Sequence, residues 1–231
     1  MKRGRMVRAH GERTRARLIE VAGQLFAERG FDGATGQAIC RRAGTHPASI
    51  VYHFGGMAGL YRQVLDEAQR RLVSTETLRA AVAAQPTPER KLGAFLGLIV
   101  GALASPASGS WAGKLFGREF VSPSALYGKA HDRTLRIRAA MLKSIVGAIA
   151  GRPPEDPAVA RACLSTMAPC AVLLLFDRRK IGRVFPQLQF SPAQAAQMTE
   201  HLMSFALAGI AAIGKAQHRH SPTIRPSTRL R

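Results

Sequence analysis

Cationic side chains dominate the chemistry that this sequence can perform on another molecule. The chain has 34 lysine and arginine residues against 14 aspartates and glutamates, a formal net charge of +20 at pH 7. An excess of this size favours a polyanionic partner, either nucleic acid or an anionic membrane surface. Basic residues are densest at the two ends: residues 1–73 hold 13 basic and 6 acidic residues, and residues 214–231 hold 5 basic residues and none that is acidic.

The remaining reactive side chains lack the spacing that catalysis or metal binding requires. The three cysteines form no CxxC pair and no cluster with histidine, which disfavours a structural zinc site. Glycine-rich phosphate loops and nucleophile elbows are also missing from the sequence. We therefore expect a protein that is not an enzyme and that uses no cofactor and no metal. So few cysteines, in odd number, fit a reducing cytoplasm.

No segment of the sequence predicts a membrane partner. The longest weakly polar run, Ala162 to Phe176, is shorter than the ~20 residues of a spanning helix and contains Pro169. The basic N-terminus is followed by further charges rather than by the apolar stretch of a signal peptide.

Three helical patterns near the N-terminus position the residues with the clearest functional spacing. A stripe at i, i+3, i+4, i+7 and i+8 predicts an amphipathic helix, which Thr14 would cap and Gly30 would end; the stripe comprises Leu18, Val21, Ala22, Leu25 and Phe26. A second helix is expected from Thr35 to Arg42. A third opens at Pro47 after the turn at Gly44. Two short helices joined by a tight glycine turn and braced by a longer one indicate a helix-turn-helix.

In that geometry the first turn of the third helix lies nearest the base edges of the major groove. The candidate base readers are Thr45, His46, Pro47, Ala48 and Ser49. A serine hydroxyl can donate or accept at a base edge, and an alanine methyl can pack on a thymine methyl. The alternative is that these small residues only let the backbone approach the DNA.

Phosphate contacts are expected from the second helix and from the chain's N-terminus. Thr35 and Gln37 begin the second helix, where side chains and free N–H groups meet phosphates. Arg3 and Arg5 belong to an expected flexible basic arm over residues 1–11, which would follow the phosphates or enter the minor groove. The alternative for these arginines is a solvated basic surface.

These residues carry a family resemblance. Residues 14–61 resemble the DNA-binding domain of TetR-family transcriptional regulators. The matching residues run from Leu18 through Leu25-Phe26-Ala27, Gly30-Phe31, Ala34-Thr35, Ile39 and Ala43-Gly44 to Tyr52-His53-Phe54-Gly55-Gly56 and Leu60-Tyr61. The resemblance implies that Tyr52 and His53 sit on the sugar-phosphate backbone. Two positions depart from the family, which usually has an aromatic residue at Val51 and often has lysine at Met57.

The rest of the chain is similar to the subgroup with a CerR-like C-terminal domain, through residues 117–124 and the later stretches at 176–179 and 205–209. Helical patterns recur at about 89–104, 112–121, 124–150, 155–178 and 191–214. The predicted fold is all-α, with an N-terminal three-helix helix-turn-helix DNA-binding domain and a C-terminal helical ligand-binding and dimerisation domain. The expected ranges are 1–11 for the arm, 12–58 for the DNA-binding domain, 59–214 for the effector-binding and dimerisation domain, and 215–231 for a disordered basic tail.

The resemblance also implies a homodimer and a ligand cavity. Two helices rich in small and apolar residues, Ala160–Phe176 and Met198–Ile213, would pair with their copies, although a purely intramolecular core is the alternative. Residues that would line the cavity are Trp111, Phe116, Glu119, Phe120, Tyr127, His131 and Phe176. Glu119 is the leading choice as a polar group in an apolar pocket. Cys163 and Cys170 share a helix face and are either buried and inert or a thiol sensor.

The expected function is a ligand-responsive transcriptional repressor. A homodimer would bind a palindromic operator in double-stranded DNA and leave it when an unidentified small-molecule effector enters the C-terminal domain. The alternative is a basic protein that binds nucleic acid without regard to sequence.

Overall fold

The computed structural model describes residues 2–105, 109–124, 126–175, 178–188 and 191–218; of residues 2–9, 128–132, 178–179 and 216–218 it describes the backbone only. All regular elements in these ranges are helical, so the all-α prediction is confirmed. They are α1 (Lys2–Arg29), α2 (Gly36–Ala43), α3 (Ala48–Phe54), α4 (Met57–Leu72), α5 (Thr75–Ala83), α6 (Pro88–Ala104), α8 (Trp111–Val121), α9 (Gly128–Ala150), α10 (Pro157–Leu175), α11 (Arg178–Val184), the 3-10 helix Pro192–Gln194 and α12 (Ala195–His218).

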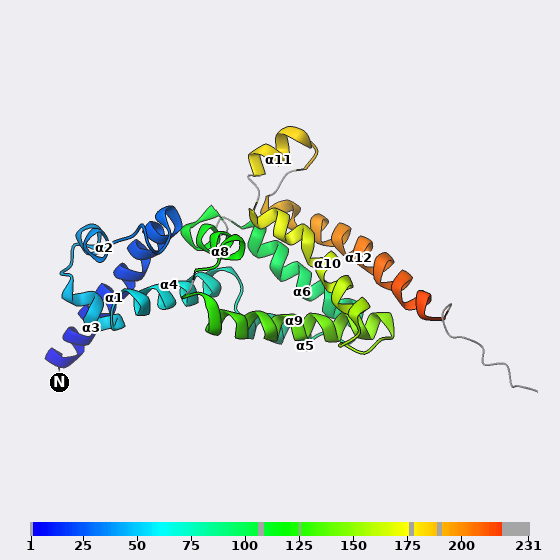
Figure 1. Cartoon of the computed structure of the whole chain (residues 1–231), viewed down its shortest axis with the longest axis horizontal. Coiled ribbons are helices and arrows are strands. Elements are labelled where there is room, and N and C mark those ends of the chain that lie inside the picture. The colour runs from blue at the N-terminus through cyan, green and yellow to red at the C-terminus, as the bar shows by residue number, and fades with distance from the viewer. Residues whose placement is uncertain (1, 106–108, 125, 176–177, 189–190, 219–231) are drawn as a thin grey trace, which may run out of the picture.

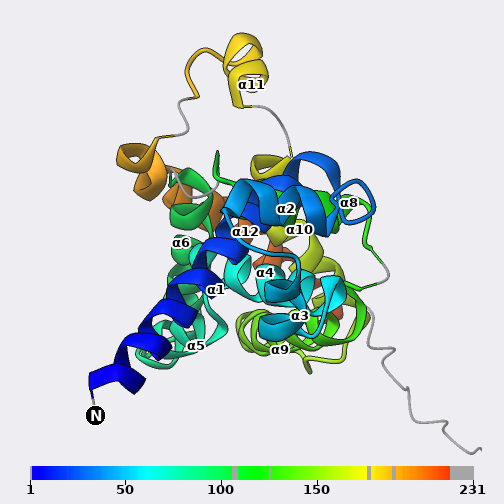
Figure 2. The same cartoon turned by 90° about the vertical axis from the view of Figure 1, so that its left-hand side faces the viewer.

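The molecule is elongated, with α1, α2 and α3 at one end and α6, α9, α10 and α12 at the other (Figure 1). Helices α4 and α8 lie between the two groups. Figure 2 views the molecule along its long axis from the end that carries α1, α2 and α3. Helix α11 stands away from the other helices in both views.

The buried stripe of α1 and the two short helices that follow it form as the sequence predicts. Leu18, Ala22 and Phe26 of the α1 stripe are fully buried. The Thr35 hydroxyl caps α2 by accepting a hydrogen bond from the Ala38 N–H, at 3.2 Å. Gly44 then ends α2 in the left-handed conformation, with φ at 64°, which glycine adopts without steric cost.

Helix α1 begins earlier than the sequence predicted. It starts at Lys2, so most of the expected arm over residues 1–11 is helical. Lysine and arginine are good helix formers, which lets the helix extend through Gly4 and Gly11. Thr14, predicted as the N-cap, instead lies inside α1, and its hydroxyl donates to the His10 carbonyl at 3.1 Å. A threonine hydroxyl inside a helix commonly donates in this way to the carbonyl four residues earlier.

The C-terminal helices pack around a second hydrophobic cluster. Its fully buried members include Leu92 and Leu96 of α6, Val146 of α9 and Ile210 of α12. Two helices were not predicted from the sequence. They are α5, which the Ser74 hydroxyl caps, and the seven-residue α11. Ser191 precedes the 3-10 helix, and its side chain makes no cap hydrogen bond to that helix.

Helix α10 is long and apolar enough, by length and composition, to cross a membrane, and only 22% of that stretch is buried within the chain. It packs against α9, α12 and α6, and it holds Pro169 and the buried Thr166. One side of α10 therefore belongs to the domain core, and the other side is apolar and open.

Candidate DNA-binding surface and its junction with the C-terminal domain

Helix α3 presents a short exposed face at the end of the molecule. Ala48, Val51 and Tyr52 are all exposed, and Tyr52 is open over 85% of its surface. Ile50, between them, is buried and anchors the helix to the cluster that contains α1 and α4. The alternation of buried and exposed positions fixes which side of α3 is available to a partner.

The hydroxyl groups predicted to read DNA already have partners inside the chain. Thr45 and Ser49 form a hydrogen bond to one another across 2.8 Å. The Thr35 hydroxyl accepts from the α2 backbone as a helix cap. Each of these side chains therefore has a local structural role, which leaves fewer hydrogen-bonding positions for an external partner.

Other predicted DNA-contacting residues lie close to this face. His46 and Pro47 are exposed directly before α3, and Gln37 is exposed in the first turn of α2. The His53 ring is half-buried, and a side chain at Gly11 of α1 would meet its Cε1 atom at 3.8 Å. The ring of Tyr52 lies edge-on to that of His53, with centroids 4.8 Å apart.

Several arginines near this face also have internal partners. Arg15 of α1 donates to Gln63 and lies over the Phe54 ring, with 5.6 Å from Cζ to the centroid. Arg42 donates to Gln24 at 3.0 Å. The backbones of Arg3 and Arg5 lie in α1, but their side chains are outside the described residues.

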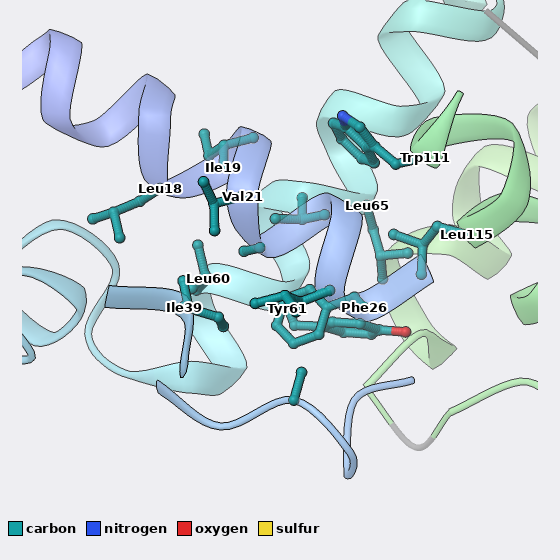
Figure 3. Packing of buried hydrophobic residues seen from close by; sticks show 14 of the residues in the cluster. Leu18, Ile19, Val21, Phe26, Ile39, Leu60, Tyr61, Leu65, Trp111 and Leu115 are labelled. Atoms are coloured by element: carbon teal, nitrogen blue, oxygen red, sulfur yellow. The ribbon is translucent and has the colours of Figure 1, made fainter. Parts of the chain in front are cut away.

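The hydrophobic cluster of the N-terminal helices is completed by α8. It contains Trp111, Ala112 and Leu115 of α8, together with Tyr127. Figure 3 shows Trp111 and Leu115 projecting from α8 toward the buried side chains of α1 and α4. Helix α8 packs far more extensively on α4 and α1 than on α10. The predicted boundary at residue 58 thus falls in the first turn of α4, a helix that shares one core with α1 and α8.

At its C-terminal end, α8 is held by a buried carboxylate. Glu119 is 2% exposed and accepts a hydrogen bond from the Tyr61 hydroxyl of α4. It also accepts from the Ser124 N–H at 2.9 Å and from the Ser124 hydroxyl at 3.0 Å. Burial, followed by the hydrogen bond to Glu119, raises the pKa of Tyr61 well above its ordinary value. Tyr61 is therefore the proton donor in this pair.

At its N-terminal end, α8 is held by the indole of Trp111. The indole N–H donates to Glu20 of α1 at 2.9 Å, and the Arg71 guanidinium of α4 lies 4.8 Å from the ring centroid. Arg71 also pairs with Glu20 at 2.8 Å. A Cβ atom at Gly23 would lie 2.5 Å from the indole, so only glycine permits this approach of α1 and α8.

The described residues that were predicted to line an effector cavity are placed differently from one another. Trp111, Glu119 and Tyr127 pack at the junction between α8 and the N-terminal helices. Phe120 is 48% exposed, and Phe116 is half-buried on α8. The side chain of His131 and the whole of Phe176 lie outside the described residues.

An open pocket of about 420 Å³ lies elsewhere, between α6 and α12. It is lined by Gln85, Glu89, Arg90, Gly93, Ala94 and Met203. None of the predicted effector residues borders it, and it lies on the C-terminal cluster rather than at α8.

The cysteines of α10 do not have the properties of a thiol sensor. Burial raises the pKa of Cys163 and of Cys170 to about 11 each. The thiolate is the reactive form, so the raised pKa lowers the reactivity of both thiols at neutral pH.

Sequence reasoning missed two features of this surface. Val51, treated only as a departure from a family pattern, is 66% exposed on α3, one turn beyond Ala48. The i, i+3 spacing of the two residues was the available signal. The contacts of α8 with α1 and α4 had no such signal, because their partners are 58 to 91 residues apart.

The α1–α3 arrangement, with its exposed third helix, defines a helix-turn-helix DNA-binding protein. The family model for bacterial regulatory proteins of the tetR family matches residues 18–64. A second model, the C-terminal domain of the HTH-type transcriptional dual regulator CecR, matches residues 88–210. The chain therefore belongs to the TetR family of DNA-binding transcriptional regulators and has a CecR-type C-terminal domain. The prediction of a non-enzymatic regulator is confirmed.

Curated relatives match over part of the chain. The regulator UidR of Escherichia coli K12 is 30% identical over 61 residues, 26% of this chain and 31% of its own. The probable regulator YttP of Bacillus subtilis is 32% identical over 80 residues, 34% of this chain and 39% of its own. The alignments thus span about a third of the length of these relatives.

Solved structures share the fold over most of the chain. A putative transcriptional regulator from Pseudomonas aeruginosa PAO1 aligns with a TM-score of 0.62 at 24% identity, over 87% of this chain and 93% of its own. FadR from Bacillus subtilis, in complex with stearoyl-CoA, aligns with a TM-score of 0.59 at 14% identity, over 84% and 98%.

Proposed function

We propose that this regulator is a homodimeric repressor in the bacterial cytoplasm, that it binds a palindromic operator, and that a small-molecule effector releases it. The observation that carries the proposal is the exposed face of α3 on a core that includes α8. A single reading helix covers only a few base pairs, whereas a two-fold dimer reads two half-sites about one DNA turn apart.

The proposed operator contacts divide into base-reading and phosphate contacts. The base readers lie at the start of α3: Thr45, His46, Pro47, Ala48 and Ser49. Phosphate contacts come from Gln37 and the N-terminal turn at Thr35, from Tyr52 and His53, and from Arg3 and Arg5 at the start of α1. Hydroxyl groups that bond to one another hold a fixed orientation, which favours a single register on the DNA.

Open apolar surface on two C-terminal helices supports the dimer. Leu164 of α10 is 73% exposed, and Phe205 of α12 is 75% exposed. The two helices pack against one another within the chain. Apolar side chains this exposed on neighbouring helices are typical of an interface with another subunit. A second copy would bury them in a four-helix bundle.

Helix α8 offers the route from effector to DNA. It holds α4 through Tyr61 and Glu119, and it holds α1 through Trp111 and Glu20. An effector that binds better when α8 is displaced would reorient α1 and α4, and with them α3. About 5.5 kcal/mol of differential affinity moves a two-state equilibrium from 1:99 to 99:1. Because one protein of the same fold is known with stearoyl-CoA, acyl-CoA thioesters belong in the first effector screen.

The proposal is tested by gel-shift titration of the full chain against the DNA upstream of its own gene, with random duplex of equal length as the competitor. A protected palindrome in a footprint and a two-subunit mass in solution are the expected results. Equal affinity for both duplexes at moderate salt would instead favour a basic protein that binds nucleic acid without regard to sequence. The net charge of +20 is compatible with that alternative.

A further inference from the structure

The exposed side chains at the start of α3 lack the groups that usually specify a base. Bidentate recognition of guanine uses arginine or lysine, and that of adenine uses asparagine or glutamine. Helix α3 contains none of these four residue types, since its sequence from Ala48 to Phe54 is ASIVYHF. Its one serine shares a hydrogen bond with Thr45.

Apart from Tyr52, which the proposed function assigns to a phosphate contact, the exposed side chains of α3 are hydrocarbon. Ala48 and Val51 lie one turn apart on the same side of α3, and both are exposed. Val51 is 66% exposed. An aliphatic side chain in this position has one complementary feature in the major groove, the 5-methyl group of thymine.

We infer that Ala48 and Val51 form a hydrophobic reading surface for thymine methyl groups, with Val51 as the residue that determines specificity. The inference rests on the proposed operator binding and names the base feature that α3 recognises. His46 and Pro47 are exposed directly before α3 and lie beside this surface.

The experiment has two stages, both with the full chain. A preferred site is first selected from random duplex DNA. Each thymine of that site is then replaced, one position at a time and symmetrically in both half-sites, by deoxyuridine, which removes only the methyl group. We expect one position in each half-site to lose about fourfold in affinity per methyl group, the effect of exposing one buried methyl.

A variant ties this effect to the residue. Val51→Ala is expected to weaken binding to the thymine site and to abolish the difference between thymine and deoxyuridine at the sensitive position. Val121→Ala on α8 is the matched control, because Val121 is equally exposed at 67% and lies away from α3. It should keep the full difference.

Two results would overturn the inference alone: a selected site in which no deoxyuridine replacement changes affinity, or an unchanged thymine preference in the Val51→Ala variant. A selection that yields no discrete site would overturn the proposed operator binding together with the inference.

Discussion

The hydroxyl group of Tyr61 in α4 donates a hydrogen bond to the carboxylate of Glu119 in α8, and both side chains are buried. Both residues follow the predicted domain boundary at residue 58, yet their helices share a core with α1. A buried carboxylate is costly unless its oxygens are paired, so this bond fixes where α8 sits on α4.

Replacing Tyr61 by phenylalanine should lower the free energy of unfolding. The variant leaves one carboxylate oxygen without its buried donor, a cost of about 1–3 kcal/mol. Urea denaturation of the full chain measures it. Tyr52→Phe removes the same hydroxyl from a residue that is 85% exposed and should change stability by less than about 0.5 kcal/mol. Equal effects of the two substitutions would contradict the structural importance of the buried bond.

Alanine at position 23 should destabilise the protein, although alanine normally favours a helix. Its Cβ atom would lie 2.5 Å from the buried indole of Trp111, which cannot retreat without leaving Glu20. The matched substitution is Gly101→Ala in α6, where no atom lies within 4 Å of the new Cβ. There the helix propensity of alanine should raise stability by up to about 1 kcal/mol. Thermal unfolding of both variants decides the matter, and a stabilised Gly23→Ala variant would refute the close contact.

A fragment that contains only α1–α4, residues 1–73, should not fold cooperatively. It lacks Trp111, Ala112 and Leu115, which complete the core between α1 and α4. Circular dichroism during heating should show partial helicity that declines without a sharp transition, whereas the full chain unfolds in a defined step. A fragment that unfolds as sharply as the full chain would show that α8 is dispensable to this core.

The thiols of Cys163 and Cys170 should alkylate slowly at neutral pH and faster as the pH approaches 11, where burial places their pKa. Unfolded cysteine loses its proton near pH 9, so between about pH 9 and 11 the folded chain holds protons that the unfolded chain has released. The free energy of unfolding therefore falls as pH rises through this window. Iodoacetamide labelling followed by mass spectrometry tests the rate. Rapid labelling of the folded protein at pH 7 would revive the sensor hypothesis.

Local chemistry made much of the N-terminal fold predictable. The α1 stripe, the start of the second helix at Thr35 and the turn at Gly44 each depend on residues within one or two helical turns, and all three form as expected. The cap assigned to Thr14 is wrong because α1 begins earlier and the Thr14 hydroxyl donates to the His10 carbonyl inside that helix. A local pattern shows which residues are suited to a cap, not whether the helix begins there.

The candidate site was less predictable, because its key contacts join distant parts of the chain. Glu119, flanked by Phe116 and Phe120, suggested a polar group in a ligand pocket. Only the packing of α8 on α4 reveals that a Glu119 oxygen accepts a hydrogen bond from the Tyr61 hydroxyl. The same holds for Trp111, whose partner Glu20 lies 91 residues earlier. The periodicity of apolar residues along the sequence does not indicate which distant side chains form hydrogen bonds to one another.

The position of α8 also bears on how regulators of this kind can exchange parts. A chimera that joined residues 1–56 to another sensor domain would leave Phe26 and Gly23 facing an unrelated helix. The α8 face would have to be transferred with them: the indole, the neighbouring small residue Ala112, and Glu119. Recombination at the loop before α4 is therefore expected to yield functional hybrids only when the two parent proteins have matching residues where α8 packs on α1 and α4.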